Sequence, residues 1–482
     1  MMHIENLEPK SVFTYFYEIS QIPRGSGNEK AISDYIVAFA KKHNLEYTQD
    51  KAWNVLIKKA GTMGLENASP VVLQGHIDMV CEKNKEVEHD FEKDPLKLQI
   101  DGDFIKATET TLGADNGIAA AYSLAILASD DITHPPIEAL FTTNEEVGMD
   151  GARAIPKGLL KGKRLINIDS EEEGIFLVSC AGGVRVTIHL PIQQELSCDY
   201  KNAYEIKLCG LKGGHSGMEI DKQRANANKL MGRALSRLYN EFDLRIADLN
   251  GGSKDNAIAR ESDVVVVTNA PKSQMESLIN ELQEAFQYEY RNTETDISLT
   301  LETIYIPQKV FTKETTKKAI DILVLIPNGV QGMSDDIKGL VETSTNVGVV
   351  NMIDNELRFV SAIRSSVSTK KEEIKNQIKH LSEITGTTIT TMGDYPAWEY
   401  KENSELRDTC LRVYKEMYGK EPEVTAIHAG LECGLLSETM DDADMISMGP
   451  NMFDVHTPNE KVSISSVQRV WDYLKAVLKE LK

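Results

Sequence analysis

The sequence predicts an α/β protein with a mixed, largely parallel sheet, helices on both faces of that sheet, and an inserted α+β domain. Before residue 182, and again near the end of the chain, short apolar runs typical of buried strands alternate with helical patterns. Between these two parts, strands with alternating apolar and polar residues indicate a sheet that is covered on one face. The two kinds of strand therefore predict two kinds of domain.

The composition limits the classes of protein to consider. The chain has 482 residues, more than one hydrophobic core usually serves, so we expect at least two domains. Nucleic acid and anionic membranes would both repel its formal net charge of -21. The six cysteines form no Cys-x-x-Cys pair, and no stretch reaches the roughly 18 apolar residues of a membrane span. We expect a cytoplasmic protein that binds neither nucleic acid nor membrane.

Two helices are predicted at the start of the chain. Residues 11–22 and 29–43 carry apolar residues at helical spacing. Ser26 and Glu29 match the pattern of a capping box for the second helix.

The predicted strand 71–74 runs directly into His76 and Asp78. Ligands of open α/β sheets bind beyond the carboxyl ends of the strands, so these two side chains are placed for chemistry. Two residues apart in an extended segment, they project to the same side. His76 could bind a metal ion while Asp78 holds its second ring nitrogen. A purely structural hydrogen bond is the alternative interpretation.

Two further strands end in acidic residues. Residues 137–143 lead to Glu145 and Glu146, and residues 164–168 lead to Asp169. Neighbouring residues of an extended chain point to opposite sides, so the two glutamates can take different roles.

A fourth carboxylate and a second histidine complete the candidate site. Asp115 lies in a turn before a helix of small residues that begins at Asn116. It could cap this helix, or it could present its carboxylate to the crevice that His76 faces. His456 follows another strand-like run near the end of the chain.

The segment between these parts predicts a separate domain. Residues 263–302 and 355–393 share the order strand, helix, strand, which suggests duplicated α+β units. We therefore predict a catalytic domain formed by residues 1–182 and 397–482, with a second domain inserted at 183–396.

Carboxylates with two histidines and no thiolate suit divalent ions such as Zn, Mn or Co. Two such ions, about 3.5 to 4 Å apart and bridged by a carboxylate and a water, form the two-metal clamp of aminopeptidases and phosphatases. The candidate residues supply one His and one carboxylate per ion, a shared Asp and a spare Glu. The spare Glu would be the general base, so hydrolysis needs no Ser or Cys nucleophile.

The order of the motifs resembles that of a known family. The motifs are G-H-x-D at 75–78, G-A-D-N-G at 113–117, N-E-E-V-G at 144–148, N-I-D at 167–169 and V-H-T-P-N-E at 455–460. This set resembles the M20 metallopeptidases, and within them the branch of cytosolic non-specific dipeptidases, or aminoacyl-histidine dipeptidases. The segments IPRGSGNE, GLKGGHSG and HAGLECGL and the large insertion are similar to that branch too.

The resemblance implies a role for each residue of the candidate site. It assigns His76 and Asp169 to one ion, Glu146 and His456 to the other, and Asp115 to both. Glu145 would be the general base and acid, and Asp78 would orient His76. The resemblance also implies a cis peptide bond between Asp115 and Asn116.

In the family, the inserted domain is a lid that contributes to substrate binding. By resemblance, His215 would stabilise the oxyanion of the tetrahedral intermediate, Asn256 would bind the substrate carbonyl, and Arg364 its carboxylate. A histidine in a glycine-rich turn and a solvated arginine are the alternative interpretations of His215 and Arg364. Gly430 and Glu432 would also contact substrate.

The expected protein is a dinuclear metal-dependent dipeptidase that hydrolyses unblocked dipeptides, including Xaa-His, by attack of a metal-bridging hydroxide. The cofactor would be two divalent metal ions, for which Zn is the preferred candidate and Co or Mn are the alternatives. A small peptide is the expected partner, and a homodimer is possible. The alternatives are an N-acyl amino acid deacylase on the same scaffold and a non-catalytic metal-binding protein. The intact ligand set counts against the second.

Overall fold

The computed structural model describes residues 4–482, which form two compact units. The first unit consists of the chain up to Cys180 together with Tyr400–Ala426 and Leu431–Lys482. The second consists of Ala181–Glu399 and Ile427–Gly430. None of the helices in 4–482 is long and apolar enough to cross a membrane.

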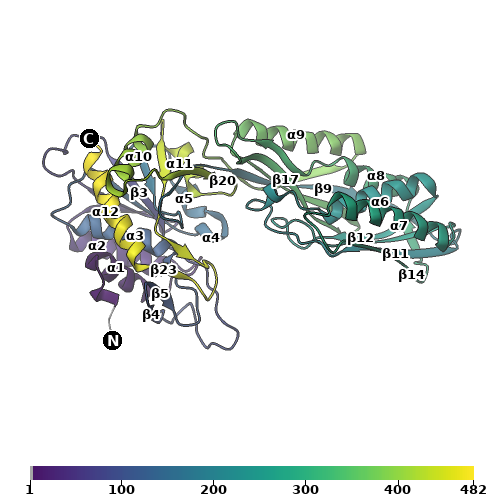
Figure 1. The fold of residues 1–482 in the computed structure, drawn as a ribbon, viewed down its shortest axis with the longest axis horizontal. Helices are drawn as coiled ribbons and strands as arrows, with labels where there is room; N and C mark the ends of the chain where they lie inside the picture. The colour runs from purple at the N-terminus through teal and green to yellow at the C-terminus, as the bar shows by residue number, and fades with distance from the viewer. Residues whose placement is uncertain (1–3) are drawn as a thin grey trace. The chain divides into compact units, whose positions relative to one another are not determined.

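An eight-stranded mixed sheet forms the centre of the described part of the first unit (Figure 1). In spatial order its strands are β1 (Glu46–Gln49), β2 (Val55–Lys59), β6 (Ile137–Thr142), β3 (Val71–His76), β7 (Arg164–Asn167), β21 (Asp444–Ser447), β8 (Ile175–Cys180) and β20 (Glu423–Ile427). The pairs β6–β3, β3–β7 and β7–β21 are parallel, whereas β1–β2, β2–β6 and β21–β8 are antiparallel. This arrangement confirms the predicted fold class.

Every residue of β3 and β6 is buried, so the sheet is covered on both faces. The helices of this unit are η1 (Ile4–Asn6), α1 (Lys10–Ser20), α2 (Lys30–Lys42), α3 (Ala114–Ala128), α4 (Glu145–Gly148), α5 (Asp150–Ala154), α10 (Glu405–Tyr418), α11 (Glu432–Thr439) and α12 (Ile464–Glu480). Helix α3 packs on β3, and its small apolar residues allow the close approach. The parallel strands β6, β3 and β7 therefore bring their polar carboxyl ends to one edge.

A smaller four-stranded sheet packs against the same hydrophobic core. Its order is β22 (Met452–Phe453), β23 (Lys461–Ser463), β5 (Phe104–Ala107) and β4 (Leu98–Asp101). The sheet joins the region after β3 to the segment that carries His456.

The predicted capping box is wrong. Glu29 itself occupies the N-cap of α2 in a helical conformation, and no side chain caps this helix. Ser26 Oγ instead donates to Asp78 Oδ2 at 2.8 Å, and Glu29 Oε1 accepts from Asn144 N at 3.0 Å. Both side chains therefore support the ends of β3 and β6.

The second unit has a nine-stranded sheet among the residues that the structure describes (Figure 1). Its order is β14 (Ser298–Thr303), β11 (Asn202–Cys209), β13 (Ser262–Thr268), β12 (Leu244–Gly251), β17 (Val341–Ile353), β18 (Glu356–Ser365), β9 (Gly182–Pro191) and β19 (Thr388–Tyr395), with β16 (Gly329–Met333) paired to β17. Strands β10 (Gln194–Leu196) and β15 (Lys309–Phe311) form a separate pair. The helices are η2 (Ile220–Lys222), α6 (Ala227–Glu241), α7 (Lys272–Glu289), α8 (Lys313–Leu325) and α9 (Ser368–Thr385).

The two predicted strand–helix–strand segments occur in this sheet as related units. Strands β13 and β14 flank β11 and are joined by α7, whereas β18 and β19 flank β9 and are joined by α9. Each segment thus encloses one strand contributed from elsewhere in the chain.

The short segment Ile427–Gly430 packs with the second unit, although the sequence placed it in the catalytic domain. Ala181 N donates to the carbonyl oxygens of Ile427 and Ala429 at 3.1 and 3.0 Å. His428 Nε2 lies 2.7 Å from Ser344 Oγ. These contacts join residues far apart in sequence, so no local pattern indicated them.

Candidate metal centre

His76 ends β3 and is surrounded by carboxylates. Its Nε2 lies 3.0 Å from Asp115 Oδ1 and 3.4 Å from Asp169 Oδ1. Its Nδ1 lies 3.3 Å from Asp78 Oδ1, which is the side chain that the sequence places beside this nitrogen. Burial opposes protonation of this ring, but the carboxylates of Asp169 and Asp115 outweigh it and raise the pKa of His76.

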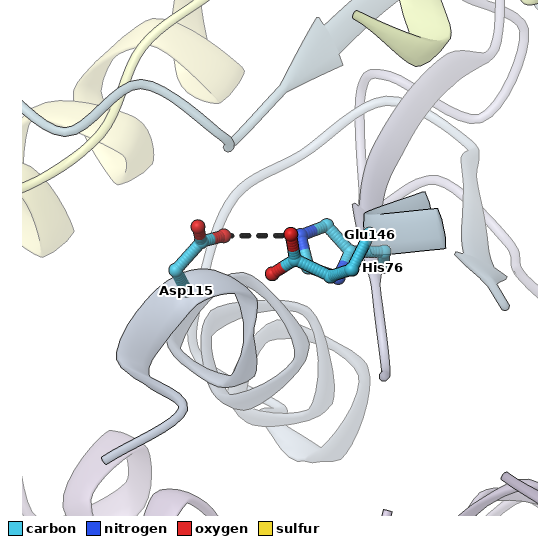
Figure 2. A group of neighbouring side chains, drawn as sticks. All are labelled: His76, Asp115 and Glu146. Atoms are coloured by element: carbon cyan, nitrogen blue, oxygen red, sulfur yellow. Dashed lines mark hydrogen bonds and ion pairs between the residues drawn. The ribbon is translucent and has the colours of Figure 1, made fainter. Parts of the chain in front are cut away.

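Asp115 faces two histidines that come from distant parts of the chain. Oδ1 lies 3.0 Å from His76 Nε2, and Oδ2 lies 3.0 Å from His456 Nε2. The same His456 nitrogen lies 3.0 Å from Glu146 Oε2. Figure 2 shows the side chains of His76, Asp115 and Glu146 close together, with Asp115 at the start of α3. Each oxygen of one carboxylate is therefore directed at a different imidazole.

The first turn of α3 departs from helical geometry at Asp115 and Asn116, and the peptide bond between them is cis, as the resemblance implies. Gly75 is needed for the close approach of this turn to β3. A Cβ at position 75 would overlap Asn116 Oδ1 and the Cβ of Ala119. The glycine of the G-H-x-D motif thus lets Asp115 reach His76.

Glu145 and Glu146 begin the short helix α4, so the expectation of an extended chain is wrong here. The carboxylate of Asp78 accepts hydrogen bonds from Glu145 N at 3.1 Å and Glu146 N at 3.3 Å. The two glutamates still have different surroundings, because Glu146 contacts His456 whereas burial raises the pKa of Glu145 well above its usual value. Burial also raises the pKa of Asp169, to about 6.

The donor atoms fit a divalent ion. The ligand atoms that His76, Asp115 and Glu146 can offer lie within 4.8 Å of one another. Burial raises the pKa of the neighbouring Asp169, so its anion is poorly stabilised by its surroundings and a bound cation would supply the missing charge. Imidazole nitrogen with carboxylate oxygen, and no thiolate, is a donor set for Zn, Co or Mn.

The affinity for a metal ion should depend on pH through His456. Hydrogen bonds to Asp115 and then Glu146 raise the pKa of His456 to about 11. Because this pKa is higher than in the unfolded chain, the protonated ring of His456 stabilises the metal-free fold at neutral pH. This contribution is lost as the pH rises through about 11.

Because a metal ion binds the unprotonated ring, binding at His456 must release its proton. We expect the affinity for Zn to rise about tenfold per pH unit from about pH 6 to 8, as measured by competition with a chelator of known affinity. An affinity that stays constant over this range would contradict the coupling.

Glu432, predicted to contact substrate, is fully buried at the start of α11. Its Oε2 accepts from Gln74 Nε2 at 2.6 Å and from Thr142 Oγ1 at 2.7 Å. Gln74 Oε1 in turn accepts from Asn167 Nδ2 at 2.6 Å. Burial raises the pKa of Glu432 to about 8. The carboxyl group thus belongs to a buried polar network that joins β3, β6 and β7 just before their polar ends.

His215 and Arg364 lie in the second unit and have defined surroundings there. His215 Nδ1 accepts from Gly217 N at 3.2 Å and Met218 N at 3.0 Å, so a neutral ring carries its proton on Nε2. Burial, followed by the charge of Arg364, lowers the pKa of His215. Arg364 Nη1 donates to Tyr395 Oη at 3.2 Å. A neutral ring with a free Nε2–H is the form that an oxyanion donor requires.

Asn256 and Gly430 also belong to the second unit. The carbonyl oxygen of Asn256 accepts from Ser216 N at 2.9 Å, next to His215. Gly430 ends the segment that contains His428, whose pKa is lowered to about 3 by burial and then by Arg364. His428 is therefore a neutral, buried side chain.

The chain is similar in sequence to a known family of peptidases over most of its length. The sequence model of peptidase family M20/M25/M40 matches residues 72–480. The chain belongs to this family. The predicted assignment to the M20 metallopeptidases is thereby confirmed, and with it the prediction of a peptide-bond hydrolase.

Two relatives with 40% and 41% identity match over nearly the whole chain. The cytosol non-specific dipeptidase of Escherichia coli (strain K12) is 40% identical over 482 residues, covering 100% of this chain and 99% of the relative. The crystal structure of aminoacylhistidine dipeptidase from Vibrio alginolyticus matches with a TM-score of 0.94 and 41% identity, covering 99% of this chain and 98% of that one.

A tripeptidase from Staphylococcus aureus has a TM-score of 0.57 and 16% identity, covering 98% of this chain and 99% of its own. At that identity the likeness concerns the fold alone.

Proposed function

We propose that this protein is a dinuclear metal-dependent dipeptidase that hydrolyses unblocked dipeptides, including those that end in His. The observation that carries the proposal is the position of Asp115, whose two carboxylate oxygens each lie 3.0 Å from the Nε2 of a different histidine. A carboxylate that faces two candidate ligand histidines in this way could be shared by a pair of ions. The two full-length relatives, both named dipeptidases, support the choice of substrate.

The proposed ligands divide into two sets that share Asp115. His76 and Asp169 would hold one ion, and Glu146 and His456 would hold the other. When bound, the ions would supply Lewis acidity, which polarises the scissile carbonyl and lowers the pKa of a water molecule. Zn is the proposed metal, with Co or Mn as alternatives that the same donors accept.

Glu145 would move the proton during the reaction. Its carboxylate would take a proton from the attacking water and give it to the leaving amine, which requires a pKa near the working pH. The raised pKa of Glu145 supports this assignment. Asp78 would fix the ring of His76 through Nδ1 and hold the start of α4 through two backbone amides.

The second unit would contribute to recognition of the peptide. His215 would donate its Nε2–H to the oxyanion, Asn256 would bind the carbonyl, and Arg364 the carboxylate of the dipeptide. Gly430 would contribute backbone contacts. Glu432 would act on the site through Gln74 and Thr142, to which it is hydrogen bonded. A cytoplasmic location, supported by the name of the Escherichia coli relative, and a homodimer complete the proposal.

The test is release of free amino acid from Ala-Ala and β-Ala-His, with N-acetyl-Ala as the contrasting substrate. The protein is stripped with a chelator, and Zn, Co or Mn is then added back singly. We expect activity on the two dipeptides to be lost and then restored at about two ions per chain. Hydrolysis of N-acetyl-Ala alone, or of no substrate under any metal, would refute the proposal.

A further inference from the structure

Glu460 binds the turn that carries Asp115, although the two residues are far apart in sequence. Its Oε2 accepts from Leu112 N at 2.8 Å and Gly113 N at 3.0 Å. Its Oε1 accepts from Ala114 N at 2.8 Å and Asp115 N at 3.3 Å. Helix α3 begins here without a side-chain cap of its own, so this buried carboxylate supplies the acceptors that the first amides lack.

Arg24 binds backbone carbonyl oxygens of this region, whereas Glu460 binds backbone amides. Its Nη1 donates to the carbonyl oxygens of Ile77 at 3.0 Å and Asp78 at 2.9 Å, and its Nη2 donates to that of Gly113 at 2.5 Å. The side chain is 1% exposed. Burial lowers the pKa of Arg24, and the carboxylate of Glu460 opposes this shift, so the two buried charges stabilise each other.

Glycines make room for this guanidinium. A Cβ at Gly113 would lie 2.5 Å from Arg24 Nη2, and a Cβ at Gly117 would lie 2.7 Å from it. Gly113 also has a φ of +64°, which disfavours other residues. The two outer glycines of the G-A-D-N-G motif are therefore explained by Arg24.

The two side chains connect three segments that carry proposed ligands. Arg24 joins the carbonyls just after His76 to the turn of Asp115, and Glu460 joins the same turn to the segment of His456. All seven of these hydrogen bonds go to backbone atoms.

We infer that Arg24 and Glu460 are positioning residues, which hold the backbone of Asp115 so that its two oxygens reach both His76 and His456. This inference rests on the proposed dinuclear centre. A purely structural pair would change the stability of the fold but not the geometry of the ions. The two cases therefore differ in a property of the metal centre itself.

The variant Glu460→Gln tests the inference, because it keeps the shape but turns an acceptor oxygen into an amide NH₂ that faces backbone N–H groups. We expect the affinity of the folded, metal-free protein for Co²⁺ to fall about 10- to 100-fold. We also expect the absorption spectrum of the bound Co²⁺ to change. The conservative variant Glu460→Asp, which keeps both acceptors, should recover part of the affinity.

Glu138→Gln is the matched control. Glu138 is also buried, and its Oε2 accepts from Lys161 N and Gly162 N, both at 2.8 Å, on a segment without proposed ligands. We expect this variant to lose comparable thermal stability while its Co²⁺ affinity and spectrum stay as in the unaltered protein.

The outcomes separate the inference from the proposed function. If the unaltered protein binds fewer than two Co²⁺ ions, the proposed dinuclear centre is refuted and the inference with it. If the unaltered protein binds two and Glu460→Gln binds them with the same affinity and spectrum, the inference alone is overturned. Should Glu460→Gln fail to fold, Arg24→Lys, which keeps the buried charge but not the fork of donors, is judged by the same two outcomes.

Discussion

Glu145→Gln is expected to abolish turnover of dipeptides while both metal ions stay bound. Glutamine has nearly the shape of glutamate but cannot accept or return a proton, so only the proton transfer is lost. Removing a general acid–base group typically lowers the rate about 100- to 10,000-fold. The measurement is the initial rate on Ala-Ala in Zn, together with the zinc content of the purified variant. Near-normal rates would contradict the assignment of Glu145 as the base.

The adjacent residue provides a matched comparison. Glu146 Oε2 lies 3.0 Å from His456 Nε2, and Glu146 is the proposed ligand of the second ion. We expect Glu146→Gln to lose about one ion per chain, whereas Glu145→Gln keeps both. If both variants kept two ions, the assignment of Glu146 as a metal ligand would be wrong, because removing a ligand should release its ion.

The edge of the sheet could be predicted because it depends on local pattern and on a general rule of topology. An apolar run that ends in His76, or in Asp169, marks a buried strand and its polar end. Parallel neighbours bring such ends together, and β3 pairs in parallel with both β6 and β7. The roles proposed for the candidate ligands came instead from the resemblance of the ordered motifs to the M20 metallopeptidases.

Contacts between distant segments could not be predicted in the same way. Ser26 and Glu29 match a capping box by spacing, yet each makes a tertiary hydrogen bond that no local pattern specifies. Arg24 and Glu460 are charged and fully buried, against the usual tendency of such residues, because each binds several backbone groups. Their presence inside the motifs IPRGSGNE and VHTPNE was the one available signal.

The short helix α4 shows that such distant contacts also decide secondary structure. The residues after β6 were expected to be extended, but the carboxylate of Asp78 accepts from the amides of Glu145 and Glu146 and stabilises a helical turn. The capping group, Asp78, lies just beyond the end of another strand, β3. The sequence around Glu145 alone therefore cannot show where the strand stops and the helix begins.

Asp115→Ala is expected to remove both ions and all activity. Each oxygen of Asp115 faces a different histidine, at 3.0 Å, so its loss takes a ligand from both proposed ions at once. Asp169→Asn, by contrast, should weaken one ion alone, because Asp169 lies beside His76 and belongs to a single proposed set. The measurement for both variants is zinc per chain after dialysis against a buffered Zn solution.

The fold should survive Asp115→Ala, because Glu460 and Arg24 bind the backbone of this turn and not the side chain of Asp115. An unchanged circular dichroism spectrum would therefore assign the loss of metal to the missing carboxylate and not to unfolding. If Asp115→Ala kept two ions, Asp115 could not be the bridge. If it lost only one, His76 and His456 would have to serve independent ions, and the proposed dinuclear mechanism would have to be abandoned.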